Sequence, residues 1–321
     1  MVRAGGAHVS GMTSVRIGTR SSALALAQAE QVRSLLSARG VTAELTTYTT
    51  VGDRVLDKPL SKIGEKGLFT KELEDDLLEG RTDCAVHSLK DLPTASPAGL
   101  TIVALLARED PRDALVLPAD SARYTLMTLP HGARVGSSSL RRKAQLSALR
   151  PDLVPVELRG NVGTRLKKLD EHQMDAAFLA AAGLRRLGLG TRIVEYLDAP
   201  RWLPAAGQGA IAIQVRADDA ASVAVFGALD DAPTSRAVAA ERAFLAALEG
   251  GCQVPIGALA IGSGHDDLVL HGMIANLAGT RVVRGSEPIG TGDAARAGRA
   301  LAATLHAAGG AEILAELRTN A

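Results

Sequence analysis

The sequence predicts an α/β fold followed by a smaller α+β domain, and three observations support this. Short apolar runs alternate with helical patterns over residues 15–120, as in a βα fold, and residues 112–200 repeat this style. Residues 204–216 (PAAGQGAIAIQVR) have the pattern of a return strand after a glycine turn. From about residue 231 the pattern changes to one helix, several apolar runs and a closing helix. At 321 residues, the chain is long enough for two or three domains.

In the first part of the chain, predicted strands alternate with helices that carry apolar residues at helical spacing. The predicted strands are Val15–Ile17, Leu45–Thr50 and Cys84–Val86. The predicted helices carry Ala25, Ala29, Val32 and Leu36 before a stop at Gly40, and Phe69, Leu73 and Leu77 before a stop at Gly80. Residues 52–67 form a charged, glycine-bounded loop, and a loop of this length is usually functional or disordered.

The second part repeats this alternation, and the last part breaks it. The second part has predicted strands at Ala133–Val135, Val154–Leu158 and Ala176–Ala181, a helix over Arg141–Leu149 and another with Val162, Leu166 and Leu169 on one face. The last part has a helix that turns Val238, Leu245 and Leu248 inward, apolar runs at Leu259–Ile261, Leu268–Ile274 and Arg281–Gly285, and a helix over Ala294–Ala308. Three such runs indicate a small antiparallel sheet.

Composition excludes several classes of protein. The chain has 36 Lys and Arg against 35 Asp and Glu, and this near balance argues against a general nucleic-acid binder. Only 2% of residues are aromatic, so the chain has few side chains on which nucleic-acid bases could stack. No run of about 18 apolar residues suggests a membrane span. Two cysteines make neither a disulfide framework nor a zinc site, which favours a reducing cytoplasm. Residues 1–13 lack the apolar core of a signal peptide and are expected to form a flexible leader.

Basic and hydroxyl residues gather at the predicted strand ends. These segments are Arg20-Ser21-Ser22, Lys90-Asp91, Ser139-Leu140-Arg141-Arg142, Arg159-Gly160-Asn161 and Arg185-Arg186. Open α/β sheets bind ligands outside the carboxyl ends of their strands. Helix N-termini attract anions, and arginine holds carboxylate or phosphate groups with two parallel hydrogen bonds. One such arginine would be an ordinary surface residue, but five basic loops together predict a shared crevice for a polyanionic ligand.

Four residues are candidates for either a catalytic or a structural role. Asp91 is either a counter-ion or a catalytic carboxylate that protonates a leaving group or stabilises a developing cation. His87 is more often a hydrogen-bonded structural residue than a direct participant. Cys84 lies in an apolar run and is expected to act as a small buried hydrophobe. Cys252 follows Gly250-Gly251, where the backbone can approach a bulky partner, and its reactivity depends on exposure and thiolate character.

Eight segments of the chain match a known family in order. They are VRIGTRSSALALAQA (15–29), GLFTKELEDDLL (67–78), DCAVHSLKDLP (83–93), GSSSLRRKAQL (136–146), LRGNVGTRLKKLD (158–170), LAAAGLRRLGL (179–189), PAAGQGAIAI (204–213) and ERAFLAALEGGCQVPIG (241–257). Over nearly all of residues 14–321, the chain resembles the hydroxymethylbilane synthases, also called porphobilinogen deaminases. The leader lies outside this resemblance.

The resemblance implies an architecture and a reaction. Two lobes with mixed sheets, like those of a type II periplasmic binding protein, would enclose the active site, and a small C-terminal α+β domain with a three-stranded antiparallel sheet would carry the cysteine. The implied boundaries are 14–108 plus about 206–228 for lobe 1, 109–205 for lobe 2 and 229–321 for the third domain. Such enzymes are monomers that join four porphobilinogen molecules head to tail, release ammonia and hydrolyse the product to linear hydroxymethylbilane for tetrapyrrole synthesis.

The resemblance also assigns roles to individual residues. Cys252 would anchor a dipyrromethane cofactor through a thioether, because a thiolate is suited to trapping the electrophilic azafulvene left when ammonia departs. Asp91 would be the catalytic carboxylate. The residues expected to bind the carboxylates of cofactor and substrate are Arg20, Ser22, Lys90, Ser139, Arg141, Arg142, Arg159, Arg165 and Arg186. The loop over residues 52–67, with Lys62 and Lys66 on it and Phe69 just beyond, would be a mobile lid that excludes water. No metal is expected.

Three other classes of function are weaker. A two-lobed carrier of an anionic ligand fits the fold and the arginines, but it predicts a secretion signal and leaves Cys252 without a role. A nucleotide-handling enzyme would need a phosphate-binding glycine motif, and the chain has neither G-x-x-x-x-G-K-[ST] nor a G-x-G-x-x-G after a strand. A nucleic-acid regulator is disfavoured by the charge balance.

Overall fold

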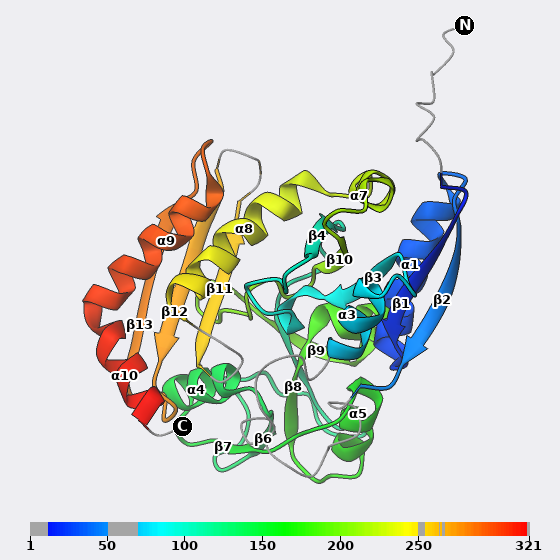
Figure 1. Ribbon diagram of the computed structural model, residues 1–321. Coiled ribbons are helices and arrows are strands. Elements are labelled where there is room, and N and C mark those ends of the chain that lie inside the picture. Colours follow the sequence, from blue (N-terminus) through cyan, green and yellow to red (C-terminus); the bar gives the residue numbers. More distant parts are fainter. Residues whose placement is uncertain (1–11, 51–69, 250–253, 263, 265–266, 320–321) are drawn as a thin grey trace, which may run out of the picture.

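The computed structural model describes residues 12–50, 70–249, 254–262, 264 and 267–319 (Figure 1). Its described strands form two five-stranded mixed sheets and one three-stranded antiparallel sheet. The predicted α/β fold with two mixed sheets, followed by a small α+β unit with a three-stranded antiparallel sheet, is confirmed. No helix within the described ranges is both long and apolar enough to cross a membrane.

The first sheet, with its helices, is called lobe 1 below. Its strand order is β2-β1-β3-β10-β4, in which β10 runs antiparallel to both neighbours and β1 runs parallel to β2 and β3. The strands are β1 Ser14–Arg20, β2 Thr42–Tyr48, β3 Cys84–Ser88, β4 Leu100–Leu105 and β10 Ile211–Arg216, and the helices are α1 Ala23–Ser37, α3 Lys71–Leu78 and α7 Ala220–Gly227. The predicted return strand is therefore β10. Because β1 and β3 are parallel, their carboxyl ends meet at one edge of the sheet.

The second sheet, with its helices, is called lobe 2. Its strand order is β7-β6-β8-β5-β9, and β5 runs antiparallel to β8 and β9. The strands are β5 Asp113–Val116, β6 Arg134–Gly136, β7 Val154–Val156, β8 Ala176–Ala180 and β9 Ile193–Leu197, and the helices are α4 Leu140–Leu149, α5 Val162–Asp170, α6 Ala181–Arg186 and the 3₁₀ turn η3 Gly190–Arg192. Arg185 and Arg186 were expected in a strand-end loop, but they form the last turn of α6.

The C-terminal unit packs helices on one face of its sheet (Figure 1). Its strands are β11 Ile256–Ile261, β12 Val269–Ala275 and β13 Val282–Pro288, and its helices are α8 Ala232–Ala247, α9 Ala294–Leu305, the turn η4 His306–Gly310 and α10 Ala311–Thr319. Gly272 lets the sheet approach the helices, because a Cβ there would lie 2.7 Å from the Phe244 ring. The helix predicted over Ala294–Ala308 corresponds to α9, which ends at Leu305. The chain then turns through Gly309, whose φ of 107° is left-handed, into α10, which was not predicted.

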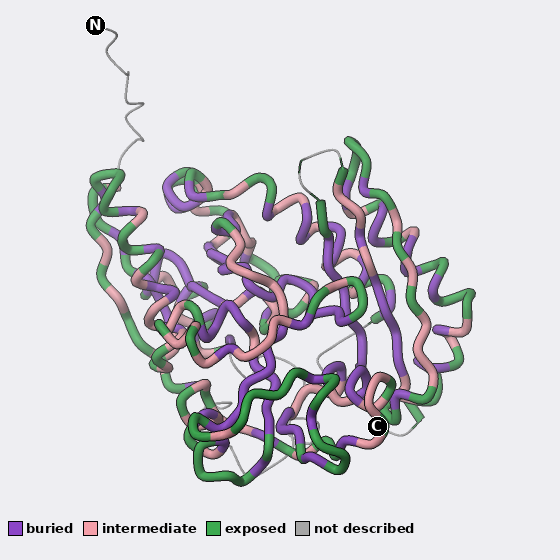
Figure 2. Tube along the Cα trace, turned by 180° about the vertical axis from the view of Figure 1, so that it is seen from behind, coloured by how far each residue is buried: buried purple, intermediate pink, exposed green. Residues whose placement is uncertain are grey.

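Two chain segments connect the lobes: residues 106–112, between β4 and β5, and residues 198–210, between β9 and β10. Away from these segments, α1 meets α6, where a Cβ at Gly183 would lie 3.5 Å from Leu24 Cδ2. The central strands of each sheet are buried, as the purple trace in Figure 2 shows. The two lobes therefore also meet through α1 and α6, away from the chain segments that connect them.

Candidate active site

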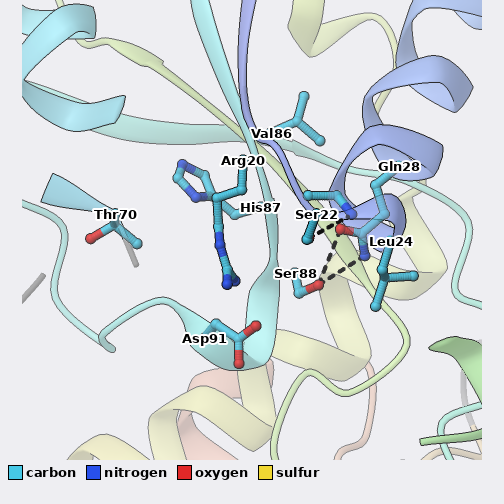
Figure 3. A pocket seen from close by; sticks show the side chains of 10 residues that line it. Arg20, Ser22, Leu24, Gln28, Thr70, Val86, His87, Ser88 and Asp91 are labelled. Carbon is cyan, nitrogen blue, oxygen red and sulfur yellow. Dashed lines mark hydrogen bonds between the residues drawn. The ribbon is translucent and has the colours of Figure 1, made fainter. Parts of the chain in front are cut away.

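A pocket lies at the carboxyl ends of β1 and β3, against the first turns of α1 (Figure 3). Its lining includes three residues that the sequence analysis singled out for catalysis or binding, namely Arg20, Ser22 and Asp91. Arg20 ends β1, and its guanidinium points toward the Asp91 carboxylate in Figure 3. Leu24 also lines the pocket, and because it packs near Gly183 of α6, lobe 2 approaches this side.

Asp91 is held by a short 3₁₀ turn, η2, which spans Leu89–Asp91 directly after β3. Leu89 anchors this turn because its side chain is buried and its backbone N–H donates to the Ala210 carbonyl at 3.1 Å. The Asp91 side chain itself is exposed. Among the described residues, no hydrogen bond or ion pair to the Asp91 carboxylate is found, so its oxygens face the pocket as open acceptors.

Ser22 and Gln28 arrange the α1 side of the pocket. Ser22 is the N-cap of α1, and its Oγ accepts from the Ala25 N–H at 3.3 Å, as expected for a serine at a helix start. Gln28 is buried, and its Nε2 donates to Ser88 Oγ at 2.8 Å. Sequence reasoning missed Gln28 and Ser88, although a glutamine among the apolar positions of α1 was a detectable signal.

His87 lines the same pocket from within the core. Its Nε2 lies 3.1 Å from Gln214 Oε1, and Gln214 Nε2 donates to Glu74 Oε1 at 3.2 Å. Thr70 Oγ1 completes the chain by donating to Glu74 Oε2 at 3.1 Å. Burial lowers the pKa of His87 to about 4, so the ring is neutral at physiological pH. This geometry supports the structural interpretation of His87.

Lys90 and Arg165 bring cations to Asp91 from the two lobes. Burial lowers the pKa of Lys90 to about 8, with the negative charge of Asp91 opposing the effect and Arg142 adding to it. Arg165, on α5 of lobe 2, donates from Nε to the Gly160 carbonyl at 2.7 Å. Burial also lowers the pKa of Arg165 to about 10, and Asp91 again acts in opposition. Asp91 therefore acts electrostatically on cations of both lobes.

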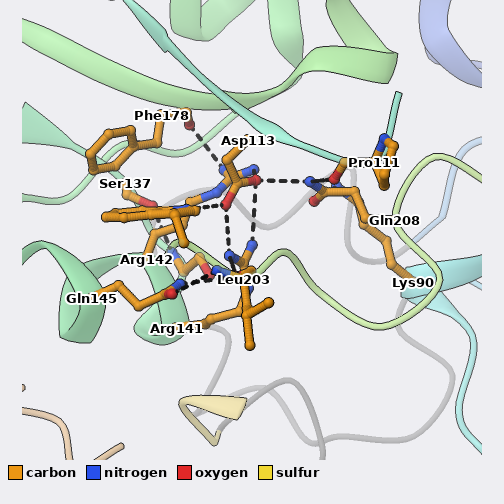
Figure 4. A network of polar contacts seen from close by, with 12 residues as sticks. Lys90, Pro111, Asp113, Ser137, Arg141, Arg142, Gln145, Phe178, Leu203 and Gln208 are labelled. Carbon is orange, nitrogen blue, oxygen red and sulfur yellow. Dashed lines mark hydrogen bonds and ion pairs between the residues drawn. The ribbon is translucent and has the colours of Figure 1, made fainter. Parts of the chain in front are cut away.

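Arg141 and Arg142 are turned inward, toward a buried acid (Figure 4). Both lie in the first turn of α4 and are 5% exposed. Arg141 Nη1 lies 2.6 Å from Asp113 Oδ2, and Arg142 Nη2 lies 2.7 Å from Asp113 Oδ1. Although burial alone would raise the pKa of Asp113, these two positive charges hold it well below its usual range. The sequence indicated crevice arginines here, but much of their charge is matched inside the protein.

The remaining predicted binding residues take different places. Ser139 is the N-cap residue of α4, and its backbone N–H donates to Ser137 Oγ at 3.1 Å. Arg159 is half-buried just before the start of α5. Arg186 does not line the pocket of Figure 3, and its Nη2 donates to the Gly209 carbonyl at 2.7 Å. Arg185 pairs with Glu109 at 2.9 Å.

The last site predictions concern the two cysteines and the loop over residues 52–67. Cys84 is fully buried in β3, and burial raises the pKa of its thiol well above the usual value, which fits a small hydrophobe. Cys252, Lys62, Lys66 and Phe69 lie outside the described residues. Within the described ranges, no group of three or more His, Cys, Asp or Glu side chains could hold a metal ion.

The donor set fits a ligand that carries several carboxylates. The Nε atoms of Arg142 and Arg186 are buried, and neither has a hydrogen-bond partner in the described part of the chain. Burial also disfavours the charged forms of Lys90 and Arg165, as their lowered pKa values show. Desolvated cations with unused donors gain most from an anionic partner. The site is therefore suited to an acidic cofactor and acidic substrates.

Comparisons with known proteins agree with this chemistry. A family model described as the dipyromethane cofactor binding domain of porphobilinogen deaminase matches residues 15–224, and a model of that family's C-terminal domain matches residues 235–307. The porphobilinogen deaminase of Roseiflexus castenholzii is 51% identical over 304 residues, which cover 94% of this chain and 99% of the relative. That of Moorella thermoacetica is 50% identical over 311 residues, covering 96% and 98%.

Solved structures show a more distant likeness. Lipoprotein Tp32 from Treponema pallidum has a TM-score of 0.44 and 15% identity, covering 68% of this chain and 91% of its own. A putative methionine-binding lipoprotein from Bacillus subtilis has a TM-score of 0.41 and 13% identity, covering 69% and 92%. Both TM-scores are below 0.5. The family models and the close relatives, in contrast, cover most of the sequence, and the chain belongs to the porphobilinogen deaminase family.

Proposed function

We propose that this chain is a hydroxymethylbilane synthase, a transferase of tetrapyrrole biosynthesis. It joins four porphobilinogen molecules head to tail with release of ammonia, and hydrolysis frees linear hydroxymethylbilane. Membership of the porphobilinogen deaminase family supports the reaction. The observation that carries it is the exposed Asp91 carboxylate, which lies in a pocket with Arg20 and acts electrostatically on Arg165 of the other lobe.

Asp91 is the proposed catalytic residue. Its oxygens accept hydrogen bonds from pyrrole N–H groups and stabilise the positive charge that develops as ammonia leaves. The same carboxylate is placed to take the ring proton after coupling. Its exposure, and the absence of a hydrogen-bond donor to it among the described residues, support this role because the oxygens are not already satisfied.

Cys252 is the proposed attachment point of a dipyrromethane cofactor, through a thioether. The description of the matching family model and the segment ERAFLAALEGGCQVPIG support this assignment. Burial of the other thiol, Cys84, supports it too, because an inaccessible thiol with a raised pKa is a poor nucleophile. When bound, the cofactor supplies the free pyrrole position to which substrate rings are added.

The cations hold the acetate and propionate groups of cofactor and substrate. The residues proposed for this are Arg20, Ser22, Lys90, Ser139, Arg141, Arg142, Arg159, Arg165 and Arg186. Arg20, Lys90 and Arg165 have the strongest support, because Arg20 lines the pocket with Asp91 and the charge of Asp91 acts on Lys90 and Arg165. Arg141 and Arg142 share the single carboxylate of Asp113, so the pair keeps one positive charge that is not neutralised. This charge contributes to binding the carboxylates of the ligand.

The remaining proposals concern organisation. The lobe boundaries are 14–108 plus about 206–228 and 109–205, and the third domain spans 229–321. Return of the chain to the first sheet as β10 supports this division. Residues 52–67, with Lys62 and Lys66, and the neighbouring Phe69 form the proposed lid. The enzyme acts as a cytoplasmic monomer.

Intact-mass analysis of the purified protein, with peptide mapping around Cys252, tests the function most directly. An excess equal to two condensed pyrrole units on Cys252 is expected, together with turnover of porphobilinogen. The variant Cys252→Ser should lose both, and the matched control Cys84→Val should keep both. A Cys252 that stays unmodified after incubation with porphobilinogen would overturn the proposal, and a modified Cys84 would show that the wrong thiol was chosen.

A further inference from the structure

Gln208 is buried between the two lobes, in the segment that leads from β9 to β10. Its side-chain Nε2 donates to two oxygens of the lobe 2 side, the Pro111 carbonyl and Asp113 Oδ1, each at 2.8 Å (Figure 4). An amide nitrogen has only two protons to donate, so both are used. The hydrogen-bond network therefore fixes the amide orientation and turns Oε1 away from lobe 2.

Oε1 of Gln208 faces the ammonium group of Lys90, with 3.5 Å between Oε1 and Nζ. Lys90 precedes Asp91 in the turn η2 of lobe 1. Two hydrogen bonds hold the backbone of Gln208. Its N–H donates to the Ala205 carbonyl at 3.0 Å, and its carbonyl accepts from Arg108 Nε at 2.9 Å. The amide thus has little freedom to follow a moving lysine.

The glycines on both sides of Gln208 explain why the segment can pass so close to its neighbours. Gly207 and Gly209 have φ of 71° and 90°, in the left-handed region that side-chain-bearing residues avoid. A Cβ at Gly209 would lie 2.4 Å from the Glu109 carbonyl oxygen, and one at Gly207 would lie 2.9 Å from Leu89 Cδ2. Gln208 is therefore held tightly between the β4–β5 connection and the turn that carries Asp91.

Asp113 is the fixed end of this contact. Beside Gln208 it accepts from Arg141, Arg142 and the Trp202 indole, whose Nε1 lies 2.8 Å from Oδ2. All of these groups are buried. A carboxylate with four hydrogen-bond donors is held rigidly. Asp113 therefore fixes the side-chain amide of Gln208, and this amide in turn positions the Lys90 ammonium group.

We propose that Gln208 is a positioning residue that ties the Lys90 ammonium, next to Asp91, to the buried Asp113–arginine cluster of lobe 2. The inference rests on the proposed function for its catalytic meaning, since Lys90 is placed there among the carboxylate-binding groups. It adds that the neutral side-chain amide of Gln208 fixes the position of the turn η2 relative to Arg141 and Arg142. Gln208 touches no reacting atom in this role.

The charge of Lys90 is the property that reports on this contact. The charged groups that act on it are Asp91 beside it, Asp113 on β5, Arg142 on α4 and Arg165 on α5, in addition to its own burial. An acceptor at Oε1 stabilises the ammonium form, so its removal lowers the pKa of Lys90 from its value of about 8. An asparagine in its place keeps a neutral amide but is one methylene shorter, so its oxygen lies farther from Lys90 and the pKa falls in the same direction by a smaller amount.

Two variants therefore test the proposal: Gln208→Met, which removes the acceptor, and Gln208→Asn, which keeps an amide but shortens its reach by one methylene. Uniform ¹³C-lysine labelling and NMR titration of the full-length holoenzyme give the pKa of Lys90 directly, and the chain has only eight lysines to resolve. Loss of one signal in Lys90→Arg identifies the Lys90 resonance. We expect Gln208→Met to lower the pKa of Lys90 by roughly half a unit and Gln208→Asn to lower it by less.

Gln145→Met is the matched control. Gln145 is also buried and hydrogen-bonded, through Nε2 to the Leu203 carbonyl at 3.0 Å and through Oε1 to the Leu203 N–H at 2.8 Å, but no contact with Lys90 is found for it. It should leave the pKa of Lys90 unchanged. A merely structural role for Gln208 would destabilise both Gln208 variants and leave the titration of Lys90 unchanged in both, and that result overturns the proposal. If Gln208→Met does not fold, an unchanged pKa in Gln208→Asn overturns it by itself.

The pH dependence of kcat/KM separates this inference from the proposed function. The alkaline limb of the profile should move with the pKa of Lys90, downward in both Gln208 variants and further in Gln208→Met. A shifted Lys90 titration with an unmoved alkaline limb would support the contact and contradict the carboxylate-binding role of Lys90. An unmoved titration would contradict the contact whatever the activity.

Discussion

Two carboxylates near the lobe boundary have opposite environments. Asp91 is exposed in a pocket, and no hydrogen-bond donor to it is found among the described residues. Asp113 is fully buried and accepts from two arginines, an indole and an amide. Asp91 is thus available to a ligand, whereas the hydrogen-bonding capacity of Asp113 is taken up within the protein.

The same difference divides the arginines of the candidate site. Arg141 and Arg142 share Asp113, so removal of either partner leaves buried charge inside the fold. Arg165 bonds only a backbone carbonyl in the described part of the chain, and its desolvated charge still needs an anion. An arginine in a predicted crevice therefore binds ligand only to the extent that no internal acid has already neutralised it.

The largest expected effect is that of Asp91→Asn on turnover. The substitution keeps the shape of the side chain but removes the negative charge that stabilises the developing cation, so kcat should fall by at least ~10³-fold. Because the side chain is exposed, the free energy of unfolding should stay within about 0.5 kcal/mol of wild type. Porphobilinogen consumption and urea unfolding measure the two quantities. Near-normal turnover would remove Asp91 from the catalytic role.

The same substitution at the buried acid, Asp113→Asn, should act mainly on stability. It leaves two buried guanidinium groups without their counter-charge, and breaking such a pair costs about 3–5 kcal/mol. Urea unfolding of the purified variant gives the change in free energy. If Asp113→Asn unfolds like wild type, then the arginines do not depend on Asp113, and the contrast between the two acids fails.

Arg165→Gln should weaken binding more than folding. The loss of one desolvated charge partner for a substrate carboxylate costs about 2–3 kcal/mol, which is a roughly 30- to 150-fold fall in kcat/KM. Arg134→Gln is the control, since the exposed Arg134 bonds Asp175 and the carbonyls of His172 and Gln173, outside the pocket of Figure 3, and should change kcat/KM little. Equal effects of the two substitutions would mean that Arg165 has no special place in the site.

Local signals allowed much of the architecture to be predicted. Ser22 lies where the sequence placed a helix start, and the apolar stripe of Ala29, Val32 and Leu36 is buried as the spacing indicated. The start of β2 was predicted three residues late, because this edge strand begins at Thr42 with alternating exposed residues and has no apolar run to mark it.

The partners of the site residues were beyond the reach of sequence patterns. Asp113 meets Arg141 across 28 positions, and Gln208 meets Lys90 across 118, so both contacts depend on how separate elements pack. Neither pair has a spacing that repeats with helix or strand period. Segment type follows from local periodicity, whereas whether an arginine is already neutralised follows only from the tertiary structure.

The smallest expected effect concerns His87. Its buried, neutral ring is bonded within the protein, as Asp113 is, and is not open to a ligand as Asp91 is. The folded protein keeps the ring neutral down to about pH 4, whereas the unfolded chain protonates it near pH 6.5. Between these values the unfolded state binds more protons, so stability rises with pH and is lost as the pH falls from 6.5 toward 4. From pH 7 to pH 5 the loss due to His87 should be about 2 kcal/mol.

His87→Gln isolates this contribution, because other groups of the chain also titrate in that range. Glutamine can still hydrogen-bond Gln214 but takes up no proton, so the variant should lose about 2 kcal/mol less than wild type between pH 7 and pH 5 in urea unfolding. Parallel pH dependences would mean that His87 is protonated in the folded state. The ring would then carry a positive charge beside Arg20, and His87 would have to be moved from the structural to the ligand-facing group of residues.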